Sequence, residues 1–435
     1  MTKKFLNSIA VLLSAVMFFS VIPFAASAAK TEQNVGASSG TTGDCTWTLD
    51  GSGALTISGN GQMADYWLYY DDSGEEYVNY PWGNDITSVT IESGVTNIGA
   101  FAFYDCYGLT DVTISDSVTV IDPSAFEDCI RLTAIDIPDS VTVIGDGAFR
   151  DCSRLISVKT PESLTTIGVE AFRGCEKLTS ITIPAGVTSI GDEAFYNCFG
   201  LTSVYIYDLT AWCRLSFMVY LNIYGSSNPV FYTHNFYVNN ELVTDMVIPD
   251  GVESIGKAAF CGYRKLTSVT IPDSVTKINA AAFFCCGRLK NAGIADSVTS
   301  IEAYAFYGCE SMKSVTIPES VTEIGAFAFG YLNRYEKIED FTIYGKAGTD
   351  AERYANENGF KFVVGEEPAI KTGDVNLDGS VDIKDVTEIQ SALADFISLT
   401  AEQRTAADIN GSGDVSITDA TLLQMYLAEF DVVLG

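Results

Sequence analysis

Two short segments near the C-terminus place oxygen-bearing residues at the same intervals. In the first, these residues stand at loop positions 1, 3, 5, 9 and 12, with a backbone carbonyl at position 7: Asp374, Asn376, Asp378, Asp382 and Asp385, with the carbonyl of Ser380. The second begins 34 residues later: Asp408, Asn410, Ser412, Ser416 and Asp419, with the carbonyl of Asp414. Hard cations take six to eight oxygen ligands in such loops, and the carboxylate charge favours Ca²⁺. We predict two calcium ions, one in each loop.

The two loops share their turn residues and differ in charge. Gly379 and Gly413 stand at position 6, where the chain must turn sharply. Val381 and Val415, at position 8, could pair the loops through a short two-stranded contact. Because serine replaces acid at positions 5 and 9 of the second loop, we expect it to bind calcium more weakly than the first.

Each loop leads into a segment with helical periodicity. Apolar residues share one face after each loop: Val386, Ile389 and Leu393 after the first, and Leu422, Leu423, Tyr426 and Leu427 after the second. Ahead of the first loop, Pro368 and Gly373 leave no room for an entering helix. The segment is therefore a duplicated loop and helix without the first helix of an ordinary EF-hand.

With Asp rather than Glu at position 12, this unit resembles a type I dockerin, over residues 373–435 and after a linker at 366–372. The resemblance implies calcium-dependent binding to a cohesin domain of a cellulosomal scaffold. It also implies partner contacts at loop positions 10 and 11 and along each helix: Ile383, Lys384, Gln390 and Ser391, then Ile417, Thr418, Gln424 and Met425. The two sets differ, so whether both faces bind one cohesin equivalently is open.

Most of the chain is built from a 23-residue repeat. From residue 98 the skeleton Ile-Gly-x-x-Ala-Phe-x-x-Cys-x-x-Leu-x-x-Val-x-Ile-Pro-x-x-Val-x-x recurs, with its aromatic residue at Phe103, Phe126, Phe149, Phe172, Phe195, Phe260, Phe283, Phe306 and Phe329. A fixed period indicates small units that stack into one continuous core. In each unit we predict a short strand within a stretch such as residues 178–184, which its proline ends, and a second extended stretch such as residues 187–190. We also predict one short helical or 3₁₀ turn at Ala-Phe-x-x-Cys.

The chain has eleven cysteines, and seven recur at one position of the repeat: Cys106, Cys129, Cys152, Cys175, Cys198, Cys286 and Cys309. In a stacked array they form an inward ladder with neighbours about 5 Å apart. Parallel side-chain directions make a disulfide awkward, and Tyr263 and Leu332 occupy the same position in two copies. We predict buried free thiols that pack as small hydrophobic residues.

The repeat resembles the leucine-rich repeats of the bacterial surface-antigen type. The resemblance implies a right-handed curved solenoid of parallel strands. The fold class predicted for the chain is a mainly β solenoid at residues 86–365, with a β-rich N-terminal cap and a small α-helical calcium-binding dockerin. Arrays of this kind serve adhesion, protein binding and display, so the fold alone leaves the ligand open.

Both ends of the array need covering, because an open end exposes its core. A β-rich cap is predicted at residues 45–85 from apolar residues among glycines: Trp47, Leu49, Leu55, Ile57, Trp67 and Trp82. At the other end, residues 341–344 predict a last strand and residues 351–358 a closing helix.

An aromatic-rich insert at about residues 205–245 makes one spacing 19 residues longer than two repeats. Its aromatic residues are Tyr205, Tyr207, Trp212, Phe217, Tyr220, Tyr224, Phe231, Tyr232, Phe236 and Tyr237. They could stack on sugar rings or anchor a protein partner. We favour packing of the insert's own small core, and we expect His234, the only histidine, to be structural.

The N-terminus predicts secretion. Lys3 and Lys4 precede an apolar run that ends in small residues at 26–28, which indicates a signal peptide at residues 1–28 and an extracellular protein attached to a cell-surface or cellulosomal complex. No later stretch is apolar and long enough to predict a membrane span. With 56 acidic and 25 basic residues, the chain would repel phosphate backbones, so nucleic acid is not expected as a partner.

These features predict a non-catalytic protein that a dockerin anchors to an extracellular polysaccharide-degrading complex, with a repeat domain that binds a protein or polysaccharide ligand. The alternative is a glycoside hydrolase or another polysaccharide-active enzyme of the same complex. Glycoside hydrolysis needs two carboxylates about 5 to 10 Å apart, yet no acid recurs at a cleft-like position of the repeat. One histidine leaves little scope for nucleophilic catalysis.

Overall fold

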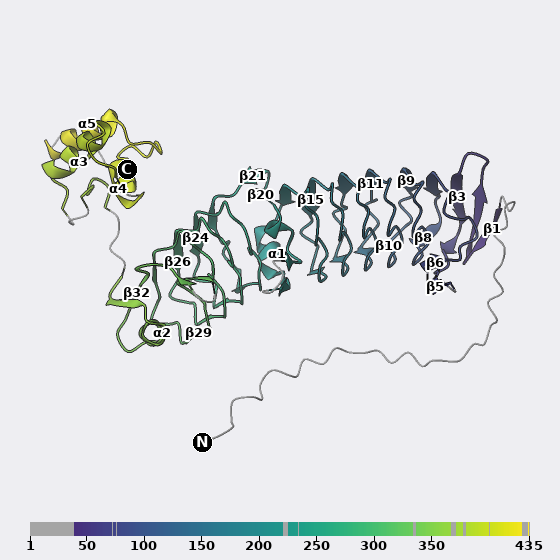
Figure 1. The fold of residues 1–435 in the computed structure, drawn as a ribbon, viewed down its shortest axis with the longest axis horizontal. Helices are drawn as coiled ribbons and strands as arrows, with labels where there is room; N and C mark the ends of the chain where they lie inside the picture. The colour runs from purple at the N-terminus through teal and green to yellow at the C-terminus, as the bar shows by residue number, and fades with distance from the viewer. Residues whose placement is uncertain are drawn as a thin grey trace, which may run out of the picture.

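The computed structural model describes residues 39–71, 73–74, 76–220, 225–233, 235–333, 336–366, 371–376, 380–399, 401–428 and 434. The predicted signal peptide lies outside these residues, as do Asp378, Gly379 and His234. The predicted fold class is confirmed: a solenoid of parallel strands makes up most of the chain, and a smaller helical body follows (Figure 1).

Each coil contributes a longer strand to a first row, which runs along one side of the solenoid in Figure 1. The first row consists of β3 (Ala54–Gly59), β7 (Ser88–Ile91), β9 (Asp111–Ile114), β11 (Ala134–Asp136), β13 (Ser157–Lys159), β15 (Ser180–Ile183), β17 (Ser203–Ile206), β22 (Asp245–Val247), β24 (Ser268–Ile271), β26 (Asn291–Ile294), β28 (Ser314–Thr316) and β32 (Thr342–Gly345).

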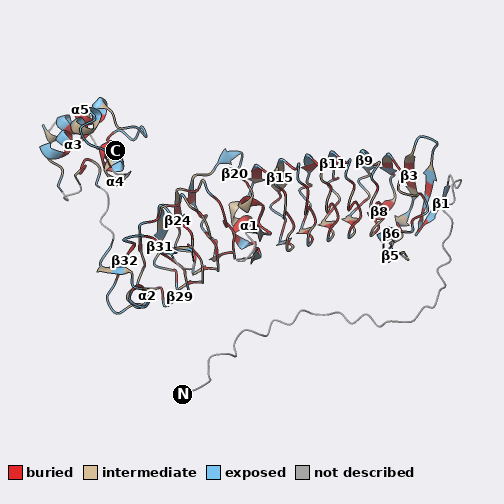
Figure 2. Ribbon diagram, viewed as in Figure 1, coloured by how far each residue is buried: buried red, intermediate tan, exposed pale blue. Residues whose placement is uncertain are grey.

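A second row of shorter strands follows in each coil. It consists of β4 (Gly61–Gln62), β8 (Val95–Ile98), β10 (Val120–Ile121), β12 (Val143–Ile144), β14 (Thr166–Ile167), β16 (Ser189–Ile190), β23 (Ser254–Ile255), β25 (Lys277–Ile278), β27 (Ser300–Ile301) and β29 (Glu323–Ile324). Buried and exposed residues alternate along the coils in Figure 2, as expected when each strand buries one side.

The register between coils advances by one repeat at a time. Ile121 lies opposite Ile144, which lies opposite Ile167 in the next coil. Threonine side chains reinforce this register, because the hydroxyl of Thr119 donates to the carbonyl of Thr96 at 3.2 Å and that of Thr165 to the carbonyl of Thr142 at 3.0 Å. The repeated hydroxyl residues therefore satisfy backbone acceptors of the preceding coil.

The phenylalanines of successive coils form a buried stack. The rings of Phe126 and Phe149 are 5.4 Å apart and inclined by 2°, and those of Phe149 and Phe172 repeat this arrangement at 5.4 Å and 7°. The surrounding Ala-Phe-x-x-Cys segments form consecutive turns closed by bonds between residues three apart, such as that from the N–H of Cys129 to the carbonyl of Phe126 at 3.3 Å, and they form no longer helix. Ser124 and Asp128 take left-handed φ values of 55° and 61°, which lets the N–H of Phe126 donate to Ala148 of the next coil at 2.8 Å. Bonds between coils therefore accompany the local bonds of each turn.

The cysteine ladder consists of free thiols, as predicted, and all seven repeat cysteines are buried. The thiol of Cys152 donates to the carbonyl of Phe126 at 3.1 Å, and that of Cys175 donates to the carbonyl of Phe149 at 3.2 Å. Six of the seven cysteines bond the stacking phenylalanine of the preceding coil in this way, and Cys106, in the first coil of the ladder, instead donates to the hydroxyl of Tyr80. Tyr263 takes the same place in one coil, and its hydroxyl reaches the carbonyl of Val243.

The N-terminal end is closed by antiparallel strands β1 (Ser39–Thr42) and β2 (Cys45–Leu49), of which β2 pairs with β3. Strand β3 in turn pairs in parallel with β7, so the first solenoid strand lies within the segment predicted as a cap. Trp47 packs edge-on against Trp82 at 6.0 Å, and Trp82 contacts Phe103 at 5.8 Å. These two tryptophans cover the first phenylalanine of the stack.

Trp67 does not belong to this cover, so its predicted packing role is wrong: its side chain is 65% exposed. It directly precedes a hairpin of β5 (Leu68–Tyr70) and β6 (Glu76–Val78), which Figure 1 shows at the N-terminal end of the solenoid. The hairpin leaves the coil path between β4 and β7 and takes Trp67 with it.

The other end of the solenoid is closed by α2 (Asp350–Asn358), as predicted, after a small hairpin of β30 (Tyr331–Asn333) and β31 (Glu336–Lys337). The hydroxyl of Tyr354 both accepts from the N–H and donates to the carbonyl of Phe329, each at 3.0 Å. This pair satisfies the backbone of the last stacked phenylalanine. One further strand, β33 (Lys361–Val364), pairs with β32 and was not predicted.

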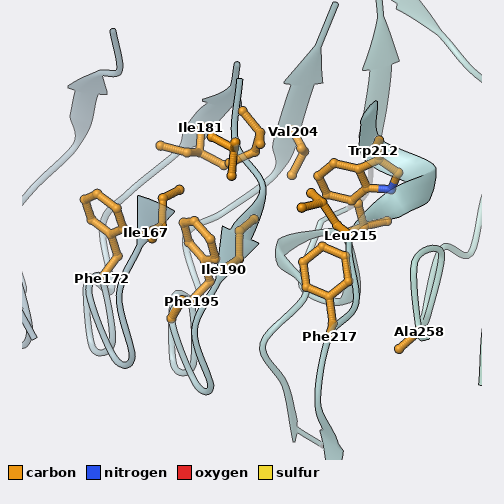
Figure 3. Packing of buried hydrophobic residues seen from close by; sticks show 14 of the residues in the cluster. Ile167, Phe172, Ile181, Ile190, Phe195, Val204, Trp212, Leu215, Phe217 and Ala258 are labelled. Carbon is orange, nitrogen blue, oxygen red and sulfur yellow. The ribbon is translucent and has the colours of Figure 1, made fainter. Parts of the chain in front are cut away.

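The insert keeps the core continuous across the break in the repeat. It comprises α1 (Leu209–Arg214), β18 (Val219–Tyr220), β19 (Gly225–Ser226), η1 (Pro229–Phe231), β20 (Asn235–Val238) and β21 (Glu241–Leu242). Figure 3 shows Trp212, Leu215 and Phe217 beside Phe195 and Ile190 of the preceding coil. The indole N–H of Trp212 donates to the carbonyl of Ala259 at 2.9 Å, which ties the insert to the next coil.

Candidate calcium-binding and partner-binding site

The second predicted calcium loop gathers several oxygen atoms at one place. The carboxylate of Asp408 accepts from the backbone N–H of Ser412 at 2.9 Å and from that of Gly413 at 2.7 Å. The side-chain carbonyl of Asn410 accepts from the same Ser412 N–H at 2.8 Å. The Ser412 hydroxyl in turn lies 3.1 Å from the carbonyl oxygen of Asp414. Residues at loop positions 1, 3, 5 and 7 are therefore neighbours in space.

The carboxylate at position 12 of this loop is buried. Asp419 has no exposed surface, and it accepts from the N–H groups of Ile409 at 2.9 Å and Ser416 at 2.8 Å. The hydroxyl of Ser416, at position 9, also lies 2.8 Å from this carboxylate. Asp419 thus connects the start of the loop to its end.

The first loop has the same framework. Asp385 is fully buried and accepts from the N–H of Asn376 at 2.9 Å and from that of Asp382 at 2.8 Å. Asp374 is also buried. The N–H of Lys384 bonds the carboxylate of Asp382 and lowers its pKa, which keeps this group ionised. Asp378 at position 5 and Gly379 at position 6 lie outside the described residues, and Ser380 is exposed.

The donor set suits a hard cation. Within the described residues no three His, Cys, Asp or Glu side chains gather as a metal cluster. In the second loop, however, the predicted ligands include amide, hydroxyl and carbonyl oxygens besides carboxylates, and such ligands are typical of calcium loops. The residues present therefore fit Ca²⁺ better than a transition metal, which prefers nitrogen or sulfur.

Three helices hold the loops: α3 (Ile383–Leu393), α4 (Ala401–Ala407) and α5 (Ile417–Leu427). Helices α3 and α5 each begin with a capping box, in which Asp382 or Ser416 caps the N-terminus and the position-12 aspartate returns the bond. Helix α4 enters the second loop, whereas the described residues ahead of the first loop, 371–373, form a turn. Each calcium loop therefore sets the start of its own helix.

A small hydrophobic core joins these helices. It is formed by Val375, Val386, Ile389, Leu399, Ala407, Ile409, Ala420 and Leu423. Leu393 and Tyr426, which lie at helical spacing with the core residues of α3 and α5, are 40% and 42% exposed and do not belong to this core. They lie toward the C-terminal ends of their helices, beyond the span of so small a core. Val381 and Val415 both pack against this core, and no strand pairing between them is found in the described residues.

Most of the residues predicted to contact the partner lie at the surface. Ile383 and Ile417, at the same position of the two units, are 62% and 65% exposed. Lys384, Gln390, Thr418, Gln424 and Met425 are also exposed, and Ser391 is partly buried. The ammonium of Lys384 pairs with the carboxylate of Asp382 at 3.1 Å, a contact that the equivalent Thr418 cannot make. The two units thus share an apolar residue and differ in charge beside it.

Sequence reasoning missed Phe396, which is 84% exposed and lies three residues after the end of α3. The signal was present, because the 34-residue offset between the two loops pairs Phe396 with Phe430, another phenylalanine. Phe430 lies outside the described residues. An exposed aromatic residue beside the exposed face of α3 extends the apolar surface of this module.

The aromatic residues of the insert serve two roles. Trp212, Phe217 and Phe236 are buried, which agrees with the predicted small core. Tyr205 and Tyr237 instead lie on the outer side of paired strands β17 and β20, where their rings stack at 4.7 Å and 8°. The remaining aromatic residues are partly buried or exposed, except Tyr220 and Tyr224, whose side chains are not described.

Comparison with known families agrees with this architecture. Residues 80–202 and 232–355 match the BspA type leucine rich repeat region in six copies, and residues 372–428 match the dockerin type I domain. The repeat matches cover more than half of the chain, which therefore belongs to the BspA-type leucine-rich-repeat family. It carries a type I dockerin at its C-terminus.

Several solved structures of bacterial proteins are similar to the chain. A leucine-rich cell surface protein of Faecalibacterium prausnitzii is 26% identical, with 76% of this chain and 96% of that chain covered at a TM-score of 0.38. A leucine-rich repeat protein of Bacteroides ovatus is 22% identical, with 74% and 98% covered and a TM-score of 0.36. The pneumococcal vaccine antigen PcpA is 16% identical, with 76% and 99% covered and a TM-score of 0.41. No curated protein sequence matches the chain significantly.

The matched families define the kind of protein. Leucine-rich repeats and dockerins are non-catalytic modules, and the matches include no catalytic domain. This agrees with the prediction of a non-catalytic protein. Dockerins bind calcium and attach to cohesins, and leucine-rich repeats are protein-binding modules. Both modules are typical of extracellular or surface proteins. Within the described part of the chain, every helix is too short or too polar to cross a membrane.

Proposed function

We propose that this protein is a secreted, non-catalytic component of an extracellular polysaccharide-degrading complex. Its dockerin attaches it to a scaffold cohesin with two bound calcium ions, and its solenoid recognises a protein or polysaccharide ligand. The observation that carries the proposal is the duplicated unit in which a buried position-12 aspartate, Asp385 or Asp419, stands two residues after an exposed isoleucine, Ile383 or Ile417.

Calcium would be held by the predicted ligands of each loop and would supply positive charge among carboxylates that otherwise repel one another. The aspartates at position 12 support this proposal, because each one connects its loop to the first turn of the following helix. An ordered loop therefore fixes the direction of its helix and of the isoleucine at the helix start. Calcium binding and formation of the partner surface are coupled in this arrangement.

The test measures binding of the full chain to immobilised cohesin domains by calorimetry, with calcium and with excess chelator. We expect binding to be lost in chelator while the near-ultraviolet circular dichroism of the solenoid is unchanged. Ile383→Asp combined with Ile417→Asp should abolish binding in calcium, because the isoleucines would form the apolar centre of the contact. Val247→Asp replaces an apolar residue that is 67% exposed on the solenoid, and this control should bind normally. Unchanged affinity in chelator would refute the proposal.

The polysaccharide context has its own test. The full chain is added to culture supernatant and to insoluble plant cell-wall polysaccharide, and the retained material is analysed. Recovery of a complex that contains polysaccharide-degrading enzymes supports the proposal. Recovery of a cohesin-bearing complex without such enzymes would contradict this part of it.

A further inference from the structure

The hairpin of β5 and β6 presents an unusual group of exposed aromatic side chains. Trp67, Tyr69, Tyr70 and Tyr77 are 65%, 44%, 65% and 43% exposed, and we refer to these four residues as the aromatic hairpin. Tyr69 lies opposite Tyr77, and their rings stack at 5.7 Å with an inclination of 28°. Large aromatic residues at this exposure are typical of binding surfaces rather than of solvated strands.

The hairpin has one side on the solenoid and one side in solvent. Val78 packs against the hydrophobic core of the solenoid, and Leu68, its partner across the hairpin, is partly buried. Successive residues of a strand point to opposite faces, so Tyr69 and Tyr77 lie on the other face. Tyr70 shares the side of Leu68 but is exposed at the end of β5. A hydrogen bond from the Tyr104 hydroxyl to the Glu76 carboxylate, at 3.2 Å, fixes the hairpin to the second coil. The hairpin is thus fixed to the solenoid on one side, and its Tyr69 face is exposed to solvent.

The charge around this face has one sign. No lysine, arginine or histidine occurs between residues 31 and 130, whereas fifteen aspartates and glutamates occur between residues 39 and 130. Glu76 lies opposite Tyr70 within the hairpin, and Asp71 directly follows β5. The rest of the solenoid contains basic residues among its acids, beginning at Arg131. The end that carries the exposed aromatic rings therefore has no basic residue of its own, and at its border Arg150 of the next coil pairs with Glu127 at 3.3 Å.

The coils beside the hairpin add further carboxylates. Asp105 and Asp128 occupy the same position in successive coils, and both are partly buried. Burial, followed by the negative charges of Asp151 and Glu127, raises the pKa of Asp128 to about 6. The pKa of Asp105 is raised by burial too, and the charge of Glu76 contributes to this shift. Repulsion between neighbouring carboxylates thus adds to the effect of burial at both positions, and Arg150 opposes it at Asp128.

We propose that the aromatic hairpin is a docking site for a cationic polypeptide segment rich in lysine and arginine. The aromatic rings would take the cations and their aliphatic stems, and the surrounding carboxylates would steer and pair them. A neutral polysaccharide could stack on the rings, but it carries no charge that the surrounding carboxylates could attract. An anionic polymer would be repelled. The inference rests on the proposed role of the solenoid as the ligand-recognising part.

Trp67 makes the test direct, because the other three tryptophans, Trp47, Trp82 and Trp212, are at most 5% exposed. The full chain is titrated with oligolysine, and the tryptophan fluorescence is recorded. We expect a saturable change at low salt that weakens as ionic strength rises, since the Debye length shortens to about 8 Å at physiological salt. Oligoglutamate and cellohexaose should cause no change. A saturable response to cellohexaose would overturn the proposal in favour of a sugar-binding surface.

Variants separate a specific site from general attraction to an acidic protein. Trp67→Ala combined with Tyr69→Ser should weaken oligolysine binding about tenfold in calorimetry. The control is Phe199→Ala, which removes an aromatic side chain that is 72% exposed elsewhere on the solenoid and should leave affinity within about twofold. Equal affinities for the hairpin variant and the control would overturn the proposal. Cohesin binding should be the same in all three proteins, so failure of this inference is distinguishable from failure of the dockerin proposal.

Discussion

The thiol of Cys152 donates a hydrogen bond of 3.1 Å to the carbonyl oxygen of Phe126, the stacked phenylalanine one coil earlier. The same carbonyl accepts only a longer bond, of 3.3 Å, from the N–H of Cys129. The cysteine ladder therefore does more than fill space, because each thiol satisfies a buried acceptor between coils. This relationship explains why a weak donor of small volume recurs at one position of the repeat.

Replacing Cys152 tests the value of this bond. Cys152→Ala removes the donor and leaves a small void in a close-packed core, so we expect a loss of about 1–2 kcal/mol in the free energy of unfolding. Cys152→Ser keeps a donor at the same place and should lose less. Both values come from chemical denaturation followed by circular dichroism. Equal losses for the two variants would show that the hydrogen bond contributes nothing.

Thiol reactivity tests the burial of the ladder. Ten of the eleven cysteines are buried, and Cys285 is the exception. Burial raises the pKa of Cys285 to about 11, so even this thiol is protonated at neutral pH and should react slowly. We expect an aromatic disulfide reagent to label at most one thiol per folded chain and all eleven after denaturation. Rapid labelling of several thiols before unfolding would contradict the buried ladder.

Asp128 should make stability depend on pH. Its pKa in the folded chain is raised to about 6, chiefly by burial, so the folded state holds a proton that the unfolded chain releases near pH 4. Stability is therefore expected to fall as pH rises from about 4 to about 6. Asp128→Asn, which keeps the shape and tolerates the left-handed backbone, should gain about 1 kcal/mol at pH 7 after allowance for solvent screening.

The control for this prediction is Asp116→Asn, which changes an exposed aspartate between β9 and β10. Thermal unfolding is measured between pH 4 and pH 8 for both variants and the unchanged chain. A gain of the same size in the control at neutral pH would assign the effect to net charge rather than to burial of Asp128.

Asp385 should stabilise the dockerin even without metal. It returns the capping-box bond of α3 and accepts from the N–H of Asn376, so Asp385→Ala leaves both donors unsatisfied. We expect a loss of about 2 kcal/mol in excess chelator, measured by unfolding of the helical signal. Lys384→Ala is the matched control at the exposed neighbour. Loss of stability only in the presence of calcium would assign Asp385 purely to metal binding.

Much of the fold could be predicted from the sequence because the same residue types recur at the same positions of each repeat. A residue such as Phe149 is preceded and followed by copies in the same environment, so its burial follows from periodicity alone. The calcium loops are predictable for a similar reason, since ligand types recur at fixed positions twice. Where the pattern is repeated, local composition and tertiary packing agree.

Predictions were wrong where one residue lacks a repeated counterpart. Trp67 looks like the cap tryptophans in composition, but the strand pairing of its hairpin, a non-local property, takes it into solvent. Tyr205 and Phe236 belong to the same aromatic insert, and only their positions on opposite sides of paired strands decide which is buried. The turn around Phe126 bonds to the next coil, which no single unit reveals.

Most coils bond their neighbours through residues 23 positions apart in the sequence, so neighbouring units are interchangeable. A whole unit can be gained or lost without creating an unmatched surface, because its neighbours present the same carbonyls, hydroxyls and thiols. Each unit gained would lengthen the solenoid by about 5 Å. The number of units therefore sets the distance between the aromatic hairpin and the far end of the solenoid. A gene duplication that adds a unit would increase this distance without changing the residues at either end.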